Sequence, residues 1–149
     1  MSTIATHSDP VWIRKADYII HAELTNCAPG ATEQLWARTV ELPVVEICCI
    51  PFFTYGFSLG DQVEVDAGTM VQRVVEKFGR QTLRIAIVNT DSREMVHGRI
   101  HDWIERNQCL HECWNCDYVV VSLEPETVYD LQIVHDWQVV GDVEYELLG

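Results

Sequence analysis

The sequence is poor in positive charge, and most of the shortage lies in its last third. The 149 residues hold 10 Lys and Arg against 23 Asp and Glu, a formal net charge of −13. Residues 101–149 contain eleven acidic residues and a single basic one, Arg106, so this segment alone contributes −10. Phosphate binding requires a basic face, so a nucleic acid is disfavoured as a direct ligand. The charge favours either simple solubility or a positively charged protein partner.

Long apolar runs are also lacking. None approaches the roughly 20 residues that cross a bilayer, and the polar start at residues 1–10 has no secretory-signal pattern. We therefore expect no membrane association and a cytoplasmic location, where the six cysteines are reduced thiols. The sequence has no repeat and no linker rich in Gly and Ser, so its length predicts one compact domain over residues 1–149.

The hydrophobic pattern predicts an α+β fold with two lobes, residues 11–80 and 81–149. The first lobe is rich in β-branched and aromatic residues between turn signals, which indicates a small bent antiparallel sheet or barrel. The second lobe predicts a ferredoxin-like β-α-β-α-β half. Strands are expected at residues 18–24, 34–40, 44–53, 62–66, 70–75, 82–88, 118–123 and 143–147.

Two helices are expected in the second lobe. The first has capping-box spacing from Asp91 to Glu94 and apolar residues at helical spacing, and it runs to about Gln108. The second follows capping signals at Thr127 and Asp130 and ends near Gly141. Residues 109–117 are expected to connect the first helix to the next strand.

A group of cysteines and histidines suggests an alternative metal site. Zinc prefers thiolate and imidazole ligands, and Cys113 and Cys116 have zinc-knuckle spacing. A second Cys-x-x-Cys pair is lacking elsewhere, so we expect no metal or other cofactor. The alternative is a zinc-dependent or other metal-binding enzyme or module using the Cys/His cluster 97–116, that is His97, His101, Cys109, His111, Cys113 and Cys116.

No set of residues has a clear catalytic pattern, so we expect no catalytic residues and no enzyme. His97, His101 and Glu105 share a helix face that suits acid–base chemistry but is more typical of a solvated surface. Cys48 and Cys49 lie in an apolar context that favours core thiols over a nucleophile. The G-x-S-x-G, Walker and H-E-x-x-H patterns are absent.

The acidic third also contains aromatic residues. Rings supply contact area and carboxylates supply charge complementarity, a composition typical of a binding site for a basic protein. The alternative is that the rings belong to the core and the acids cover the outside. The candidate partner-binding residues are Glu112, Trp114, Asp117, Glu124, Glu126, Asp130, Asp136, Asp142, Glu144, Tyr145 and Glu146.

Four stretches carry a resemblance to a known family. They are Glu33-Gln-Leu-Trp-Ala37, Ile50-Pro-Phe-Phe-Thr-Tyr-Gly56, Ser58-Leu-Gly-Asp61 and Val75-Glu-Lys-Phe-Gly-Arg-Gln-Thr-Leu-Arg84. Over residues 20–90 the chain resembles the bacterial family called domain of unknown function 4265. The family pattern has Ser-Gly-His-Ser-Thr where this chain has Phe78-Gly-Arg-Gln-Thr82, so a chemical role of that His is not expected here. The resemblance implies no activity.

These observations lead to three hypotheses. The first is an immunity protein that binds a basic bacterial toxin domain, such as a nuclease, and occludes its active site with an acidic surface. The second is the metal-binding enzyme or module described above. The third is a small regulatory domain with a small-molecule pocket, for which the sequence selects no ligand. The oligomeric state is left open.

Overall fold

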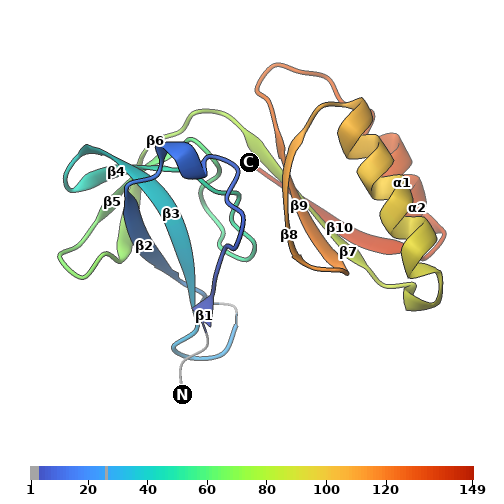
Figure 1. Cartoon of the computed structure of the whole chain (residues 1–149), viewed down its shortest axis with the longest axis horizontal. Helices are drawn as coiled ribbons and strands as arrows, with labels where there is room; N and C mark the ends of the chain where they lie inside the picture. Colours follow the sequence, from blue (N-terminus) through green and yellow to red (C-terminus); the bar gives the residue numbers. More distant parts are fainter. Residues whose placement is uncertain (1–3, 26) are drawn as a thin grey trace.

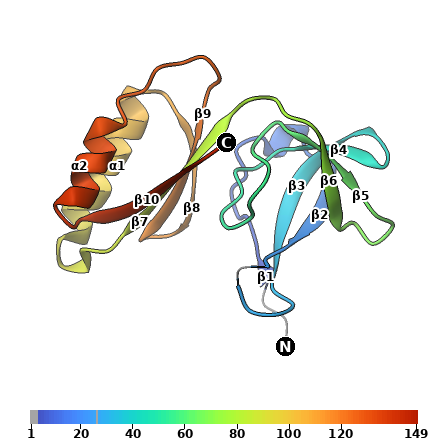
Figure 2. The ribbon, with the colours of Figure 1, turned by 180° about the vertical axis from the view of Figure 1, so that it is seen from behind.

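The computed structural model describes residues 4–25 and 27–149 and contains two β-sheets and two α-helices. The sheets lie side by side, and both helices pack on the face of the second sheet that points away from the first (Figure 1; Figure 2 from behind). The predicted α+β class is confirmed. In the described part of the chain, no helix is both long and apolar enough to cross a membrane. Residues 1–3 of the polar start lie outside the described residues.

The first sheet curls into a small barrel-like structure, as predicted. β3 pairs with β2 on one side and with β4 and β1 on the other, and β5 and β6 extend the sheet from β4. A bridge between His21 and Met70 brings β2 beside β6, which bends the sheet round on itself. The strands are β1 (Ile4–Ala5), β2 (Tyr18–Glu23), β3 (Thr32–Glu41), β4 (Val44–Ile47), β5 (Gln62–Val65) and β6 (Val71–Glu76).

The apolar run at residues 44–53 is not one strand, contrary to the prediction. β4 ends at Ile47, and residues 48–61 leave the sheet as an irregular segment between the two sheets (Figure 1). We call residues 48–61 the junction segment. Its residues Cys48, Cys49, Ile50 and Phe52 are at most 2% exposed. Burial between two lobes produces the same apolar run as a central strand, so the pattern alone could not separate them.

The second sheet has the order β10-β7-β9-β8, formed by β7 (Gln81–Ile87), β8 (Leu110–Asn115), β9 (Tyr118–Leu123) and β10 (Val143–Leu148). With helices α1 (Arg93–Arg106) and α2 (Gln132–Val139), the chain order is β-α-β-β-α-β, the ferredoxin-like arrangement. The prediction lacked β8 and treated its residues as a connection. The reason is that β8 places a carboxylate, Glu112, at a buried position, which breaks the alternation expected of a strand.

Helix α1 buries the predicted stripe of Val96, Ile100, Trp103 and Ile104 against the sheet. Its start differs from the capping-box prediction, because Asp91 lies in a 3-10 turn (Thr90–Ser92) and Ser92 is the N-cap residue. Helix α2 begins later than predicted, with Leu131 as its N-cap residue. Residues 124–130 therefore form an exposed loop, in which Val128 is 97% exposed.

The face of the second sheet that the helices leave free points toward the barrel. Strand register arranges its side chains in rows across the sheet. One row contains Glu146, Arg84, Val120 and Glu112, and a neighbouring row contains Glu144, Ala86 and Tyr118. The first of these rows lies against the junction segment, because Arg84 donates hydrogen bonds to carbonyls of that segment and Glu112 accepts one from its backbone. This shared surface is the junction between the two sheets.

Candidate functional site

A buried carboxylate, Glu33, holds the junction segment in place. Glu33 lies on β3 and shares its core face with Leu35 and Ala37, so its side chain points into the end of the barrel and is 0% exposed. Its two oxygens accept hydrogen bonds from backbone amides and from a hydroxyl of one short stretch. The donors are the amides of Phe52 (2.7 Å), Phe53 (3.0 Å) and Thr54 (3.0 Å) and the hydroxyl of Thr54 (2.7 Å).

His7 joins Glu33 to the second sheet. Its Nε2 lies 2.6 Å from Glu33 Oε2, its Nδ1 lies 2.7 Å from Glu112 Oε1, and its ring stacks on Phe52 with centroids 4.1 Å apart. Burial disfavours the charged imidazole, but hydrogen bonding to Cys49, Glu112 and Glu33 outweighs it and raises the pKa of His7 to about 12. The same contact with His7, together with the amides of Phe52 and Phe53, lowers the pKa of Glu33 despite its burial.

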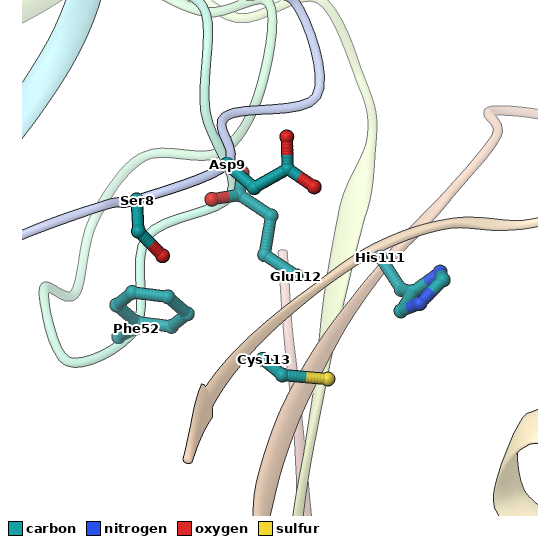
Figure 3. Close-up of a pocket in the computed structure, with 6 residues that line it drawn as sticks. All are labelled: Ser8, Asp9, Phe52, His111, Glu112 and Cys113. Carbon is teal, nitrogen blue, oxygen red and sulfur yellow. The ribbon is translucent and has the colours of Figure 1, made fainter.

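Glu112 completes the network from β8. Its second oxygen accepts hydrogen bonds from the amides of Ile50 (2.7 Å) and Val11 (3.4 Å). The His7–Glu33–Glu112 network therefore links the N-terminal segment, the barrel and the second sheet. A cavity of about 160 Å³ lies beside it, lined by Ser8, Asp9, Phe52, His111, Glu112 and Cys113. In the view of Figure 3 the His111 and Cys113 side chains point to the side of β8 opposite to Asp9 and the Glu112 carboxyl group.

The network is built for structure rather than for proton transfer. Both ring nitrogens of His7 face carboxylates, so neither is available to accept a proton from a substrate. The neighbouring thiol of Cys49 is fully buried, and burial raises its pKa away from the range of a nucleophile. Burial also raises the pKa of Cys48 to about 12. The prediction that Cys48 and Cys49 are core thiols is confirmed by their burial.

Asp61 and Arg84, which lie in the stretches that resemble a known family, also hold the junction segment in place. The Asp61 carboxylate accepts hydrogen bonds from the amides of Ser58 and Phe78, which closes the turn at Gly60. The Arg84 guanidinium donates to the carbonyls of Thr54 and Pro51. Glu33, Asp61 and Arg84 thus act on one stretch of backbone from both sheets.

Arg80, which stands in place of a family His, also has a structural position. It donates to the Ser122 hydroxyl at 3.0 Å, lies 3.7 Å from Glu124 and sits over the Trp12 ring at 5.7 Å. These contacts join β9 to the N-terminal segment.

An aromatic surface lies at the edge of the junction. It consists of Phe53, Tyr55, Trp114 and Tyr118. Phe53 packs edge-on against Trp114 at 4.9 Å and lies 5.4 Å from Tyr118, whose hydroxyl donates to the Phe52 carbonyl at 2.6 Å. Burial raises the pKa of Tyr118 to about 12, although Arg84 opposes this. Trp114 is 48% and Tyr55 is 46% exposed, which is unusual for large rings that form a cluster.

The structure separates the predicted partner-binding residues into three groups. Glu112 and Asp142 are buried at 5% and 7% exposure, so their side chains do not face a partner, while Tyr145 is half-buried and packs on the helix side against the core. Four other carboxylates are exposed and have no salt bridge among the described residues: Glu126, Asp130, Asp136 and Glu144. Asp117, Glu124 and Glu146 pair with Arg93, Arg80 and Arg84, and Trp114 belongs to the aromatic surface.

The four unpaired carboxylates do not form a single surface. Glu126 and Asp130 lie in the loop before α2, Asp136 lies on α2, and Glu144 lies on β10 on the barrel side of the sheet. The single acidic surface expected from the sequence is therefore divided. Of the four, Glu144 shares a row of the sheet with Tyr118 of the aromatic surface.

The Cys/His cluster is only partly assembled. The rings of His97 and His101 are 4.2 Å apart, and His111 on β8 contacts His101 at 5.2 Å. Burial, followed by the neighbouring His97 and His111, lowers the pKa of His101. Across residues 4–25 and 27–149, however, no three His, Cys, Asp or Glu side chains are arranged to hold a metal ion.

Sequence reasoning missed His7, Phe53 and Tyr55. His7 lies in the polar start of the chain, where the sequence shows only that a secretory-signal pattern is absent. Phe53 and Tyr55 belong to the expected strand at residues 44–53 and the bend that follows it. A signal for the network was present at Glu33, since a carboxylate that alternates with Leu35 and Ala37 occupies a core position.

Comparison with known proteins identifies a family but no activity. A solved structure described as a hypothetical protein from Neisseria gonorrhoeae matches with a TM-score of 0.69 and 18% identity, covering 86% of this chain and 91% of that one. At this identity the match shows a shared fold. Among curated proteins none matches the chain. The model of the family described as Domain of unknown function (DUF4265) matches residues 33–137. Because this match spans more than half of the chain, the protein belongs to the DUF4265 family.

Proposed function

We propose that this protein is an immunity protein that acts in the cytoplasm, where it binds a basic bacterial toxin domain, such as a nuclease, and occludes its active site. The observation that carries the proposal is the charge of the second lobe. Residues 81–149 hold thirteen Asp and Glu against four Arg, a net charge of −9. Three of the four Arg residues, Arg84, Arg93 and Arg99, already pair with carboxylates of the same lobe.

The remaining charge can attract a partner at long range, although it is divided among the loop before α2, α2 and β10. Glu126, Asp130, Asp136 and Glu144 are exposed, so their charges face solvent. A nuclease active site must attract phosphates and is therefore cationic, which makes it complementary to such a lobe. Both ring nitrogens of His7 are occupied by contacts with carboxylates, and burial raises the pKa of the Cys49 thiol. Both features favour a binding role over a catalytic one.

The proposal predicts steep salt dependence of binding. The partner to test is a basic nuclease domain of a bacterial toxin, chosen from the proteins encoded near this gene. We expect co-expression to restore growth of cells that make the toxin. We also expect the association rate, measured by stopped flow, to fall by about 10- to 100-fold between 50 and 500 mM NaCl because screening weakens electrostatic steering. An association rate that ignores salt would contradict the electrostatic part, and failure to restore growth would contradict the immunity function.

A matched pair of triple variants separates the second lobe from total charge. Glu126→Gln, Asp130→Asn and Asp136→Asn remove three exposed charges from the loop and α2. The control variant Glu23→Gln, Glu41→Gln and Glu76→Gln removes three exposed charges from the barrel. We expect the first triple variant to associate about tenfold more slowly and the control to change the rate less than twofold.

A further inference from the structure

One row of the second sheet is only partly covered at the junction, where Phe53 packs on Tyr118. The row that contains Arg84 and Glu112 is covered by the junction segment. The neighbouring row, with Glu144, Ala86 and Tyr118, ends at a bulge between Cys113 and Asn115, where Trp114 lies. Glu144 and Trp114 are exposed, and Ala86 and Tyr118 are half-buried.

Two rings of the junction segment stand beside this row. Phe53 contacts both Trp114 and Tyr118, and Tyr55 reaches β10, where its hydroxyl donates to both oxygens of Glu146 at 2.8 and 2.9 Å. The aromatic surface therefore extends from β8 at one edge of the sheet to β10 at the other. Three strand spacings amount to about 14 Å, the length of roughly four residues of extended chain.

The charge of this surface selects a cationic occupant. Arg84 already shows how a ring and a carboxylate of this face hold a guanidinium. Its Cζ lies over the Tyr55 ring, 4.9 Å from the ring centroid, and its Nη1 is 3.6 Å from Glu146 Oε1. Arg84 is 4% exposed, so it is a fixed part of the fold. Glu144, two residues along the same face, has no such partner in the described chain.

We propose that the aromatic surface and Glu144 bind two Arg or Lys side chains carried by one extended segment of a basic protein, one over the Trp114 ring at the β8 edge and one beside Glu144 at the β10 edge. The inference rests on the proposed function, because that function supplies a basic partner, and it names where and how the partner is recognised. A cation over an indole face gains cation–π energy, and a cation beside a carboxylate gains a charge-assisted hydrogen bond. Trp114 supplies the ring for one cation, and Glu144 supplies the carboxylate for the other.

A peptide titration tests the chemistry directly. The probe is an acetylated Gly-Ala-Arg-Ala-Arg-Ala-Gly peptide, and its control has citrulline, which keeps the shape of Arg without its charge. We expect the Arg peptide to shift the NMR signals of the Trp114 indole and of the Ala86 and Tyr118 amides, and citrulline to weaken binding at least tenfold. Equal binding of the two peptides, or no shift at millimolar peptide, would overturn the inference. Shifts of these signals with protein concentration alone would overturn it as well, because a second copy would then be the occupant.

Substitutions of Trp114 and Glu144 test where the peptide binds. Trp114→Ala is expected to weaken peptide binding about tenfold and Glu144→Gln about fivefold. The matched controls are Phe78→Ala, which removes an exposed ring from elsewhere, and Glu126→Gln, which removes an exposed charge from the loop before α2. Each is expected to change affinity less than twofold. Equal losses in the controls would show diffuse electrostatic attraction and overturn the site.

Growth protection distinguishes this inference from the proposed function. If a Trp114→Ala, Glu144→Gln double variant still protects cells fully from the toxin, the proposed site is contradicted and the immunity function is not. If the unaltered protein binds the peptide at the site but does not protect cells, the immunity function is contradicted and the site is not. Loss of protection in the double variant, with protection by the control variants, is the expected result.

Discussion

Replacing Glu33 by alanine is expected to destabilise the protein by about 3–5 kcal/mol, the cost of breaking a buried charge pair by removing one member. Three amides, one hydroxyl and the His7 ring lose their acceptor in a place with little access to water. Because domains are stable by only about 5–15 kcal/mol, this single change removes a large part of the total.

The measurement is urea unfolding at pH 7, followed by tryptophan fluorescence and circular dichroism. Glu23→Ala is the matched control, because Glu23 is an exposed glutamate on the adjacent strand β2, and we expect it to change stability by less than about 0.5 kcal/mol. If Glu33→Ala does not fold, Glu33→Gln provides the measurement, since it keeps the shape and one acceptor oxygen. A loss below about 1 kcal/mol in both variants would contradict the role assigned to this carboxylate.

The features that were predictable from the sequence are those with a local signal. Alternation predicted β5 and β10, and runs of β-branched, aromatic and other apolar residues between turn signals predicted β2, β3, β6, β7 and β9, all to within a few residues. Helical spacing predicted the buried face of α1. These patterns reflect contacts with a single sheet or core, which each element makes regardless of the rest of the fold.

The junction was not predictable in the same way. His7 and Glu112 are 105 residues apart in the chain, and no local pattern indicates that their side chains meet. The run at residues 48–53 is apolar because it is buried between the two lobes. The sequence of β8 does not show the pattern of a strand, because its buried position holds Glu112, the carboxylate that contacts His7. The missed strand β8, the misassigned run at residues 48–53 and the missing residues of the site therefore share one cause, a junction that forms only when both lobes are assembled.

The acidic residues show a related limit. Their number predicts a negative electrostatic potential around the second lobe. Their positions in the sequence do not show which carboxylates are buried or paired within the protein. Glu112 is bound to His7, and Asp142 accepts from Asn89 at 3.0 Å and lies 3.6 Å from Arg99. Because these carboxylates are paired inside the protein, the count of acidic residues overstates the number of carboxylates that face solvent unpaired.

The charge on His7 predicts that stability falls as the pH rises above neutrality. A pKa raised to about 12 in the folded protein means that the stabilisation is complete below the unfolded value of about 6.5 and is lost as the pH approaches 12. Between these limits the folded state holds one proton more than the unfolded state. The free energy of unfolding should therefore decrease by about 1.4 kcal/mol per pH unit.

Urea unfolding at pH 7.0, 7.75 and 8.5 measures this slope. The His7→Gln variant, with no imidazole to titrate, should be less stable at pH 7 and should lack the His7 contribution to the slope, whereas His135→Gln, an exposed change on α2, should keep it. Nitrogen-15 NMR gives a direct check, because both ring nitrogens of His7 should remain protonated at pH 8.5. On the acid side, the lowered pKa of Glu33 has the opposite sign, so its stabilisation is present above its ordinary value of 4.5 and is lost as the pH falls through the lowered value. A wild-type slope equal to that of His7→Gln would mean that His7 is neutral, and the two buried carboxylates would then need another source of compensation.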